Sequence, residues 1–225
     1  PTDDVQAILQ SRDGDVWMGL NTGGVARVRN GLVTTYSTGD GLNDDTVYSI
    51  AEGPGDDIWV GTPRGLNRIW GGRITSVRDS GQLLAGGARA LAWMPDGTMW
   101  IGTSRGGVWR LEGDRLEPLK ADGDRISPLI YVLLPDGQGG AWAGGNRGLS
   151  HIKDGRVRTY TTKDGLGDDV VLSLHQDADG SLWIGTFGGG LSRLTKDGIR
   201  TLTIRQGLYD DAVFAILEDE ARALW

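Results

Sequence analysis

The sequence contains no cysteine and only two histidines among its 225 residues. Without cysteine the chain can form neither disulfide bonds nor thiolate metal sites, and this absence fits an oxidising or a reducing compartment. The formal net charge of -7 argues against nucleic-acid binding, because a phosphate backbone requires a basic surface. No apolar run approaches the roughly 18 residues that a transmembrane helix needs. The composition therefore argues against nucleic-acid binding and against a membrane-spanning segment within this sequence.

Glycine and tryptophan, in contrast, are abundant, with 38 and 9 residues. Five tryptophans open a Trp-x-Gly motif, and a sixth tryptophan is the last residue of the sequence. Neighbouring members of this series lie 41 or 42 residues apart, and such a period indicates a repeat architecture. The six residues are Trp17, Trp59, Trp100, Trp142, Trp183 and Trp225.

Each repeat predicts four short strands, which we call A to D. An apolar segment before the tryptophan predicts strand A, and the Trp-x-Gly segment predicts strand B. Asp-Gly turns between apolar runs are typical of β-hairpins, and no segment has the periodicity of a helix. Four strands in about 42 residues are typical of a β-propeller blade. We therefore predict a single all-β propeller domain with five complete blades and the start of a sixth, at residues 3–44, 45–85, 86–127, 128–168, 169–210 and 211–225.

The recurring tryptophans are expected to fill the space between blades, because both faces of a blade pack against its neighbours. This structural role is predicted for Trp17, Trp59, Trp100, Trp142 and Trp183. Trp70 and Trp109 are not part of the Trp-x-Gly series and lie on predicted strands C. They are either sugar-stacking platforms or further packing residues.

The repeats resemble the two-component regulator propeller family. The resemblance rests on segments such as "RDGDVWMGLNTGGVARV" and "ADGSLWIGTFGGGLSRL", and on "KDGLGDDVV" before a strand A. It implies a ligand-sensing propeller from a bacterial hybrid two-component sensor, located in the periplasm and followed by a membrane anchor and an output domain. Because the sequence begins at a strand A and stops within a strand B, we expect a piece of a longer sensor.

Acidic pairs recur in the loops between units, and their second members are Asp45, Asp169 and Asp211. Such pairs could form a weak cation site at the rim, but an aspartate before a strand also fixes turns by accepting backbone N–H groups. The two histidines, His151 and His175, lack the neighbours of a metal or catalytic site. We predict no metal, no cofactor and no catalytic residue.

The position five residues after each tryptophan differs between units. It holds Arg64, Arg105 and Arg147 in the three middle units, and Thr22 and Gly188 in the outer two. This position belongs to the B–C turn, and loops at one end of a propeller gather ligand contacts. Three guanidinium groups on adjacent blades would suit a carboxylate, sulfate or phosphate group. The alternative is that each arginine pairs with an aspartate of a neighbouring loop.

Three functions remain open. The first is a non-catalytic sensor module that recognises a small or oligomeric ligand, anionic or carbohydrate, and passes the signal to a kinase or another output domain. The second is a scaffold that self-assembles or binds proteins, because unpaired strand edges recruit other strands and favour a homo-oligomer. The third is a propeller lyase of the streptogramin-degrading type, which the missing nucleophile and base disfavour.

Overall fold

The structure is a computed structural model, and it describes residues 4–77, 84 and 86–225. The predicted blade boundaries at residues 3 and 85 lie outside the described residues. Contacts within the chain divide it into two compact units, Pro1–Leu119 and Lys120–Trp225, and each is described by itself. The prediction of a single domain stays a prediction.

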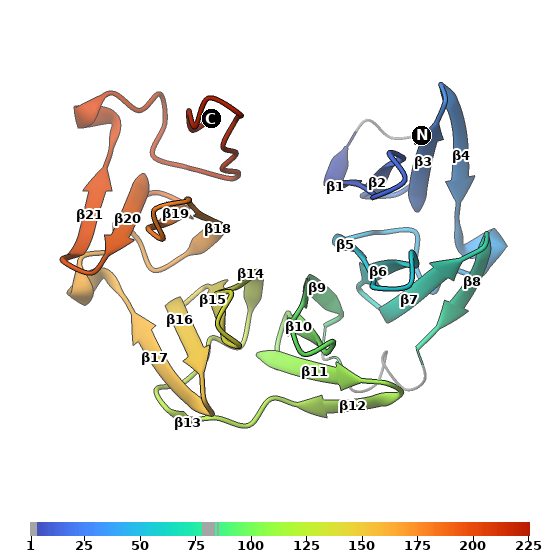
Figure 1. Cartoon of the computed structure of the whole chain (residues 1–225), viewed down its shortest axis with the longest axis horizontal. Helices are drawn as coiled ribbons and strands as arrows, with labels where there is room; N and C mark the ends of the chain where they lie inside the picture. The colour runs from blue at the N-terminus through green and yellow to red at the C-terminus, as the bar shows by residue number, and fades with distance from the viewer. Residues whose placement is uncertain (1–3, 78–83, 85) are drawn as a thin grey trace. The chain divides into compact units, whose positions relative to one another are not determined.

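The first unit contains three antiparallel sheets in which consecutive strands are neighbours (Figure 1). Sheet 1 consists of β1 (Val5–Gln10), β2 (Val16–Leu20), β3 (Val25–Arg29) and β4 (Leu32–Tyr36). Sheet 2 consists of β5 (Ser49–Glu52), β6 (Ile58–Thr62), β7 (Gly65–Trp70) and β8 (Arg73–Ser76). Sheet 3 consists of β9 (Ala88–Trp93), β10 (Met99–Thr103), β11 (Val108–Glu112) and β12 (Arg115–Pro118).

The second unit contains two sheets with the same strand order. Sheet 4 consists of β13 (Asp122–Gly123), β14 (Ile130–Pro135), β15 (Ala141–Gly145), β16 (Gly148–Lys153) and β17 (Arg156–Tyr160). Sheet 5 consists of β18 (Val171–Gln176), β19 (Leu182–Thr186), β20 (Leu191–Thr195) and β21 (Gly198–Leu202). The prediction of an all-β fold built from four-stranded antiparallel units is confirmed, whereas the number of blades in a ring stays a prediction.

Sheet 4 has a fifth strand that the sequence did not predict. Residues of β13 fall within the predicted third blade, but they pair in parallel with β17, so that Asp122 lies opposite Arg156. Residues 217–225 form a short hairpin in which Leu217 and Trp225 exchange backbone hydrogen bonds of 3.0 and 2.8 Å. This hairpin lies where the sequence predicts the start of a sixth blade.

The hydrophobic core of each unit lies between neighbouring sheets. Trp17 and Val25 of sheet 1 share a buried cluster with Val60 of sheet 2. Trp59 of sheet 2 shares another with Met99 of sheet 3. In the second unit, Leu149 of sheet 4 clusters with Val171 and Ile184 of sheet 5, and Trp142 packs against them. Large side chains therefore join sheet to sheet.

The loops that follow β4, β17 and β21 share one local structure, in which a short 3-10 helix begins after a capping Ser or Thr. These helices are η1 (Thr38–Asp40), η2 (Thr162–Asp164) and η3 (Ile204–Gln206). In sheet 1 the loop returns to the B–C turn, because the N–H of Gly24 donates to the carbonyl of Asp45 at 2.8 Å. Gly148 and Gly190 donate in the same way to Asp169 and Asp211, so each such loop is fixed beside a B–C turn, which in sheet 4 carries the predicted ligand contact Arg147.

Candidate functional site

An aspartate from the A–B turn holds the strand-C cation in several sheets. In sheet 2, Asp57 accepts the indole N–H of Trp59 at 2.8 Å and pairs with Arg68. The Arg68 guanidinium also lies over the Trp59 ring, 5.7 Å from its centroid. Sheet 5 repeats the arrangement with Asp177, Trp183 and Arg193. Sequence reasoning missed this pairing, although each unit has an acidic A–B turn and an Arg or His on strand C.

Both histidines are engaged by carboxylates. His151 takes the position of the strand-C arginine, lies 2.9 Å from Asp136 through Nε2 and stacks on Trp142 at a centroid distance of 4.0 Å. His175 of β18 lies 2.8 Å from Glu218 through Nε2. Each imidazole therefore has a structural partner.

The predicted ligand-binding arginines are all exposed on B–C turns. Arg64 and Arg105 lie on turns of neighbouring sheets in the first unit, and Arg147 lies on a turn of the second unit. Arg64 is 76% exposed and forms one ion pair, with Asp44 at 3.3 Å. Arg64 therefore follows the alternative interpretation, in which the arginine pairs with an aspartate of a loop. The prediction that the three arginines form one cluster stays a prediction.

The paired aspartates accept hydrogen bonds from backbone N–H groups. The second members, Asp45, Asp169 and Asp211, accept N–H groups at the start of η1, η2 and η3 at 2.6, 2.7 and 2.8 Å. The first members, Asp44, Asp168 and Asp210, each accept the N–H two residues ahead at 2.8, 2.6 and 2.9 Å. These contacts fix the loops. The rim cation site stays a prediction, and in the described ranges no group of three or more His, Asp or Glu side chains could hold a metal ion.

The two tryptophans outside the Trp-x-Gly series, Trp70 and Trp109, differ in environment. Trp70, at the end of β7, is 64% exposed. Trp109 is half-buried and packs against the core cluster between sheets 2 and 3, and its indole N–H has no hydrogen-bond partner. Packing is therefore the role of Trp109, whereas Trp70 offers an open ring face.

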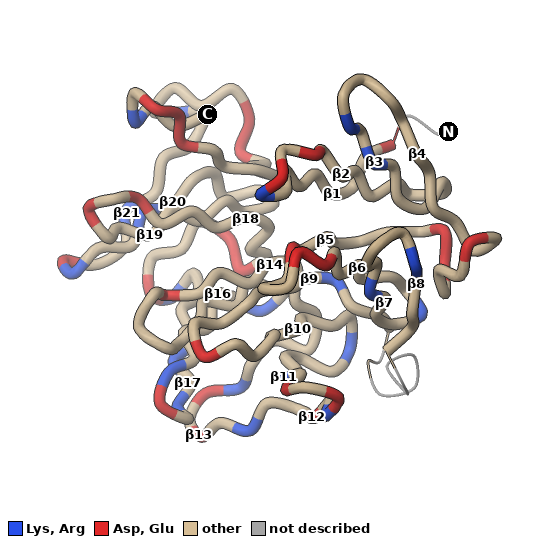
Figure 2. The backbone as a smooth tube through the Cα atoms, turned by 45° about the vertical axis from the view of Figure 1, so that its right-hand side comes forward, with Lys and Arg blue, Asp and Glu red and all other residues tan. Residues whose placement is uncertain are grey.

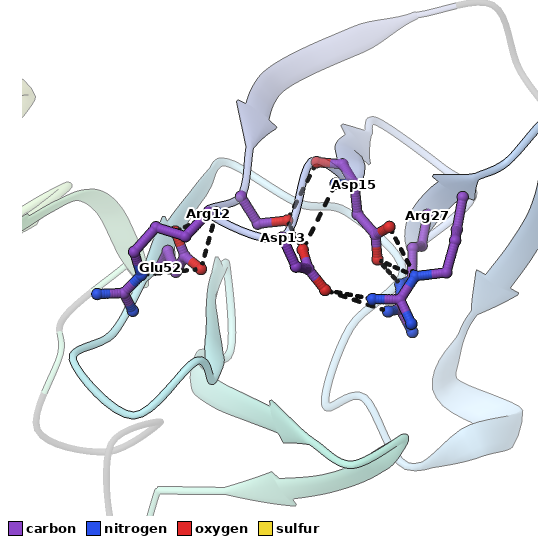
Figure 3. Close-up of polar contacts among 7 residues, drawn as sticks. Arg12, Asp13, Asp15, Arg27 and Glu52 are labelled. Atoms are coloured by element: carbon purple, nitrogen blue, oxygen red, sulfur yellow. Dashed lines mark hydrogen bonds and ion pairs between the residues drawn. The ribbon is translucent and has the colours of Figure 1, made fainter.

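A cavity of about 510 Å³ lies in the first unit at the end of the sheets opposite the B–C turns. Its walls are the A–B turn of sheet 1 and the C–D turn of sheet 2, and Figure 3 shows the charged residues around it. The Arg12 backbone N–H donates to both Glu52 carboxylate oxygens at 3.1 and 3.0 Å. Arg27 and Arg29 both bind the buried Asp15. Because acids and bases are paired here, the cavity has no excess of either charge.

Hydrogen bonds to these aspartates hold their carboxyl groups in the ionised form. The Arg29 guanidinium lowers the pKa of Asp15 despite the opposing effect of burial. Burial alone would raise the pKa of Asp136, but hydrogen bonds from His151 and two backbone N–H groups outweigh it and lower the pKa. The pKa of Asp177 is lowered in the same way, because the Trp183 indole and backbone N–H groups outweigh burial.

We expect thermal stability to fall steeply in acid. Each lowered pKa contributes stability that is complete above the ordinary aspartate value of 3.8 and is lost as the pH falls toward the folded-state pKa. The unfolding midpoint should change little between about pH 7 and 5 and decrease below about pH 4. Circular dichroism melting over this range measures it. The Asp177→Asn variant should be less stable at neutral pH, and its unfolding midpoint should decrease less in acid. If its midpoint fell with pH as steeply as that of the wild type, the lowered pKa of Asp177 would not be a source of the acid sensitivity.

The repeats themselves can be compared with known families. A family model described as two component regulator propeller matches residues 41–64 and 165–188. Both segments therefore match the two-component regulator propeller repeat. The matched segments end at Arg64 and Gly188, the B–C turn position singled out in the sequence. The predicted resemblance is confirmed. No curated protein matches the chain significantly.

Solved structures with the same fold include an enzyme and a sensor. Virginiamycin B lyase from Staphylococcus aureus is 16% identical with a TM-score of 0.77, covering 99% of this chain and 76% of the lyase. The extracellular domain of a putative hybrid two-component system from B. thetaiotaomicron is 18% identical with a TM-score of 0.70, covering 98% of this chain. The chain spans 38% of the length of that sensor domain. At these identities the likeness shows a common propeller fold. In the part of the chain that is described, no helix is long and apolar enough to cross a membrane.

Proposed function

We propose that the propeller is a non-catalytic ligand-binding module of a bacterial signal-transduction protein. It recognises an anionic or carbohydrate ligand in the periplasm and relays binding to a kinase or another output domain. The observation that carries the proposal is the exposure of Arg64, Arg105 and Arg147 on the B–C turns of regulator propeller repeats.

The chemistry of the turns favours an oxyanion on the ligand. Guanidinium groups donate two parallel hydrogen bonds to a carboxylate, and they keep their charge at any physiological pH. Arg64 shares its charge with Asp44 across 3.3 Å, whereas Arg105 and Arg147 form none of the ion pairs between described residues. A sugar acid, with one carboxylate and several hydroxyl groups, fits such donors.

The structural likeness to the lyase supports an enzymatic alternative, because the match covers nearly the whole chain. Catalysis would require a general base or a metal beside the substrate, and a histidine paired with a carboxylate is a common form of such a base. The two histidines are hydrogen-bonded to Asp136 and Glu218, and His151 is also stacked on Trp142. Among the described residues, however, neither histidine belongs to a group of three or more His, Asp or Glu side chains that could hold a metal ion, which favours binding over metal-assisted catalysis.

A scaffold function is the second alternative, and exposed apolar side chains support it. Ile8 of β1 is 70% exposed, and Phe214, Leu217 and Trp225 are exposed in the second unit. A mass that rises with concentration in sedimentation would favour this alternative.

Thermal shift measurements with sodium glucuronate test the proposal. Glucuronate should raise the unfolding midpoint of the wild-type chain, and neutral glucose should raise it less, because the carboxylate provides the contact to arginine. The triple variant Arg64→Ala, Arg105→Ala, Arg147→Ala should lose the glucuronate shift while its own midpoint stays near the wild type, since surface changes alter stability by about 0.5 kcal/mol or less each.

Arg205→Ala is the matched control, because Arg205 is an exposed arginine on η3 and not on a B–C turn. It should keep the full shift. Equal shifts in the wild type and the triple variant would reject the arginines as the site.

A further inference from the structure

Four basic side chains gather on one face of the C–D hairpin of sheet 4. In the register of β16 and β17, His151 lies opposite Arg158, and Lys153 lies opposite Arg156. Side chains two residues apart in a strand point to the same side, so the four form a compact group that we call the basic square. Figure 2 shows basic positions along β17.

Sheet 3 provides an internal comparison, because the same four positions there alternate in charge. Arg110 lies opposite Glu117, and Glu112 lies opposite Arg115. One ion pair of 3.1 Å joins Arg110 to Glu112, and another of 2.8 Å joins Arg115 to Glu117. The hairpin in sheet 3 thus neutralises its own charges, and the hairpin in sheet 4 does not.

Sheets 1 and 5 place arginines at some of these positions, and turn aspartates pair with all of them except Arg200, which lies opposite Arg193. Arg27 and Arg29 bind Asp15, and Arg193 pairs with Asp177 at 3.4 Å. In sheet 4 the turn aspartate, Asp136, pairs with His151 and with none of the other three basic side chains of this hairpin.

The remaining cations of the basic square lack acidic partners. None of the ion pairs between described residues includes Lys153, Arg156 or Arg158. Lys153 donates from Nζ to the side-chain oxygen of Gln138 at 2.7 Å, and Arg158 lies over the Tyr160 ring at 4.6 Å.

The nearest acidic residues do not cancel this charge. Asp154 lines the same cavity, and Asp122 lies opposite Arg156 on β13, but neither forms an ion pair with the square. Asp124 accepts the backbone N–H of Thr159 at 2.8 Å. Three permanent cations, Lys153, Arg156 and Arg158, therefore line the cavity together with one carboxylate, that of Asp154.

The basic square lines an open cavity of about 560 Å³. Like charges directly opposite one another in a sheet are destabilising, and this hairpin has them within a chain whose net charge is -7. A bound anion removes that repulsion. Two guanidinium forks beside an ammonium group match the several oxygens of a tetrahedral oxyanion better than those of a single carboxylate.

We propose that the basic square is a binding site for a phosphate or sulfate group, either free or as an ester. Arg156 and Arg158 donate from their guanidinium groups, and Lys153 supplies a third charge. The site lies at the C–D turn of sheet 4 and goes beyond the function proposed for the B–C turns, because it uses different residues.

Isothermal titration calorimetry at constant ionic strength tests the site. Sodium phosphate, sodium sulfate, glucose 6-phosphate and sodium acetate are the probes. We expect the tetrahedral anions to bind and acetate to bind at least about tenfold more weakly, because it accepts fewer charged hydrogen bonds. Binding of glucose 6-phosphate but not of inorganic phosphate would identify an ester as the source. Equal heats for all four anions would indicate a nonspecific ionic effect and overturn the proposal.

The double variant Lys153→Glu, Arg158→Glu transfers the charge alternation of sheet 3 to sheet 4. Its fold should be retained, because sheet 3 already carries this pattern, and its melting temperature without anions should equal or exceed that of the wild type. Phosphate affinity should fall at least about tenfold, since two charged donors are lost. Unchanged affinity in a folded double variant would refute the site.

Two further variants separate this site from others. The triple variant Arg64→Ala, Arg105→Ala, Arg147→Ala should bind phosphate at the square as the wild type does, so failure at the B–C turns is distinguishable from failure here. The reciprocal change in sheet 3, Glu112→Lys with Glu117→Arg, should add a second binding event for phosphate. Loss of phosphate binding in the B–C turn variant would move the site away from the square.

Discussion

Replacing Trp59 with alanine should destabilise the first unit by about 3–5 kcal/mol, the usual cost of removing a buried tryptophan. Trp59 is 8% exposed and belongs to the core cluster between sheets 2 and 3. Its loss opens a void beside Leu66 and Met99. It also removes the indole N–H from the buried Asp57, which keeps only Arg68 as a side-chain partner.

Trp70→Ala is the matched control from the same sheet. Because the Trp70 ring is largely exposed, its removal should change stability by about 0.5 kcal/mol or less. Urea unfolding followed by far-ultraviolet circular dichroism measures both variants without relying on tryptophan fluorescence. Equal losses in the two variants would show that Trp59 does not join the sheets.

The repeat made the strands predictable because its signals are local. Asp-Gly turns and Trp-x-Gly segments fix each hairpin within a few residues, and β2, β6, β10, β15 and β19 all contain the predicted tryptophan. The strand β13 was not predictable in this way. Its two residues pair with β17, more than thirty positions away, through backbone contacts that leave no side-chain pattern.

The site was predictable only in part, for a related reason. The position of Arg64, Arg105 and Arg147 on B–C turns follows from spacing alone. The choice of partners does not, because Asp44 reaches Arg64 through a loop between sheets. The pairing of Asp57 with Arg68 depends on how a turn folds back over a tryptophan.

The basic square, in contrast, left a signal in the sequence. The segment "HIKDGRVR" alternates basic and other residues on both sides of an Asp-Gly turn. Two-residue turns place such positions opposite one another, so register arithmetic brings His151 to Arg158 and Lys153 to Arg156. What the sequence could not indicate is that the nearby Asp122 and Asp154 form no ion pair with the basic square.

The glycine of the Trp-x-Gly motif should also tolerate substitution poorly. A Cβ at Gly144 would lie 2.6 Å from Cγ1 of Val171 and 2.7 Å from Cγ1 of Val132, closer than van der Waals contact allows. Gly144→Ala should therefore cost about 1–3 kcal/mol through overpacking. Gly188→Ala should cost far less, because the nearest atom to its Cβ, an oxygen of Asp168, lies 3.9 Å away. Thermal unfolding of the two variants compares them directly.

A double-mutant cycle shows whether the cost at Gly144 arises from the neighbouring sheet. Val171→Ala alone removes a fully buried side chain and should destabilise the second unit. In the presence of Gly144→Ala, however, it also removes the atoms that the new methyl group meets. The combined loss should then be smaller than the sum of the single losses, by at least about 0.5 kcal/mol for residues in contact. Strict additivity would place the cost at Val132 of the same sheet and not at the close approach of sheet 5 to sheet 4, because Gly144 does not have the positive φ that favours glycine.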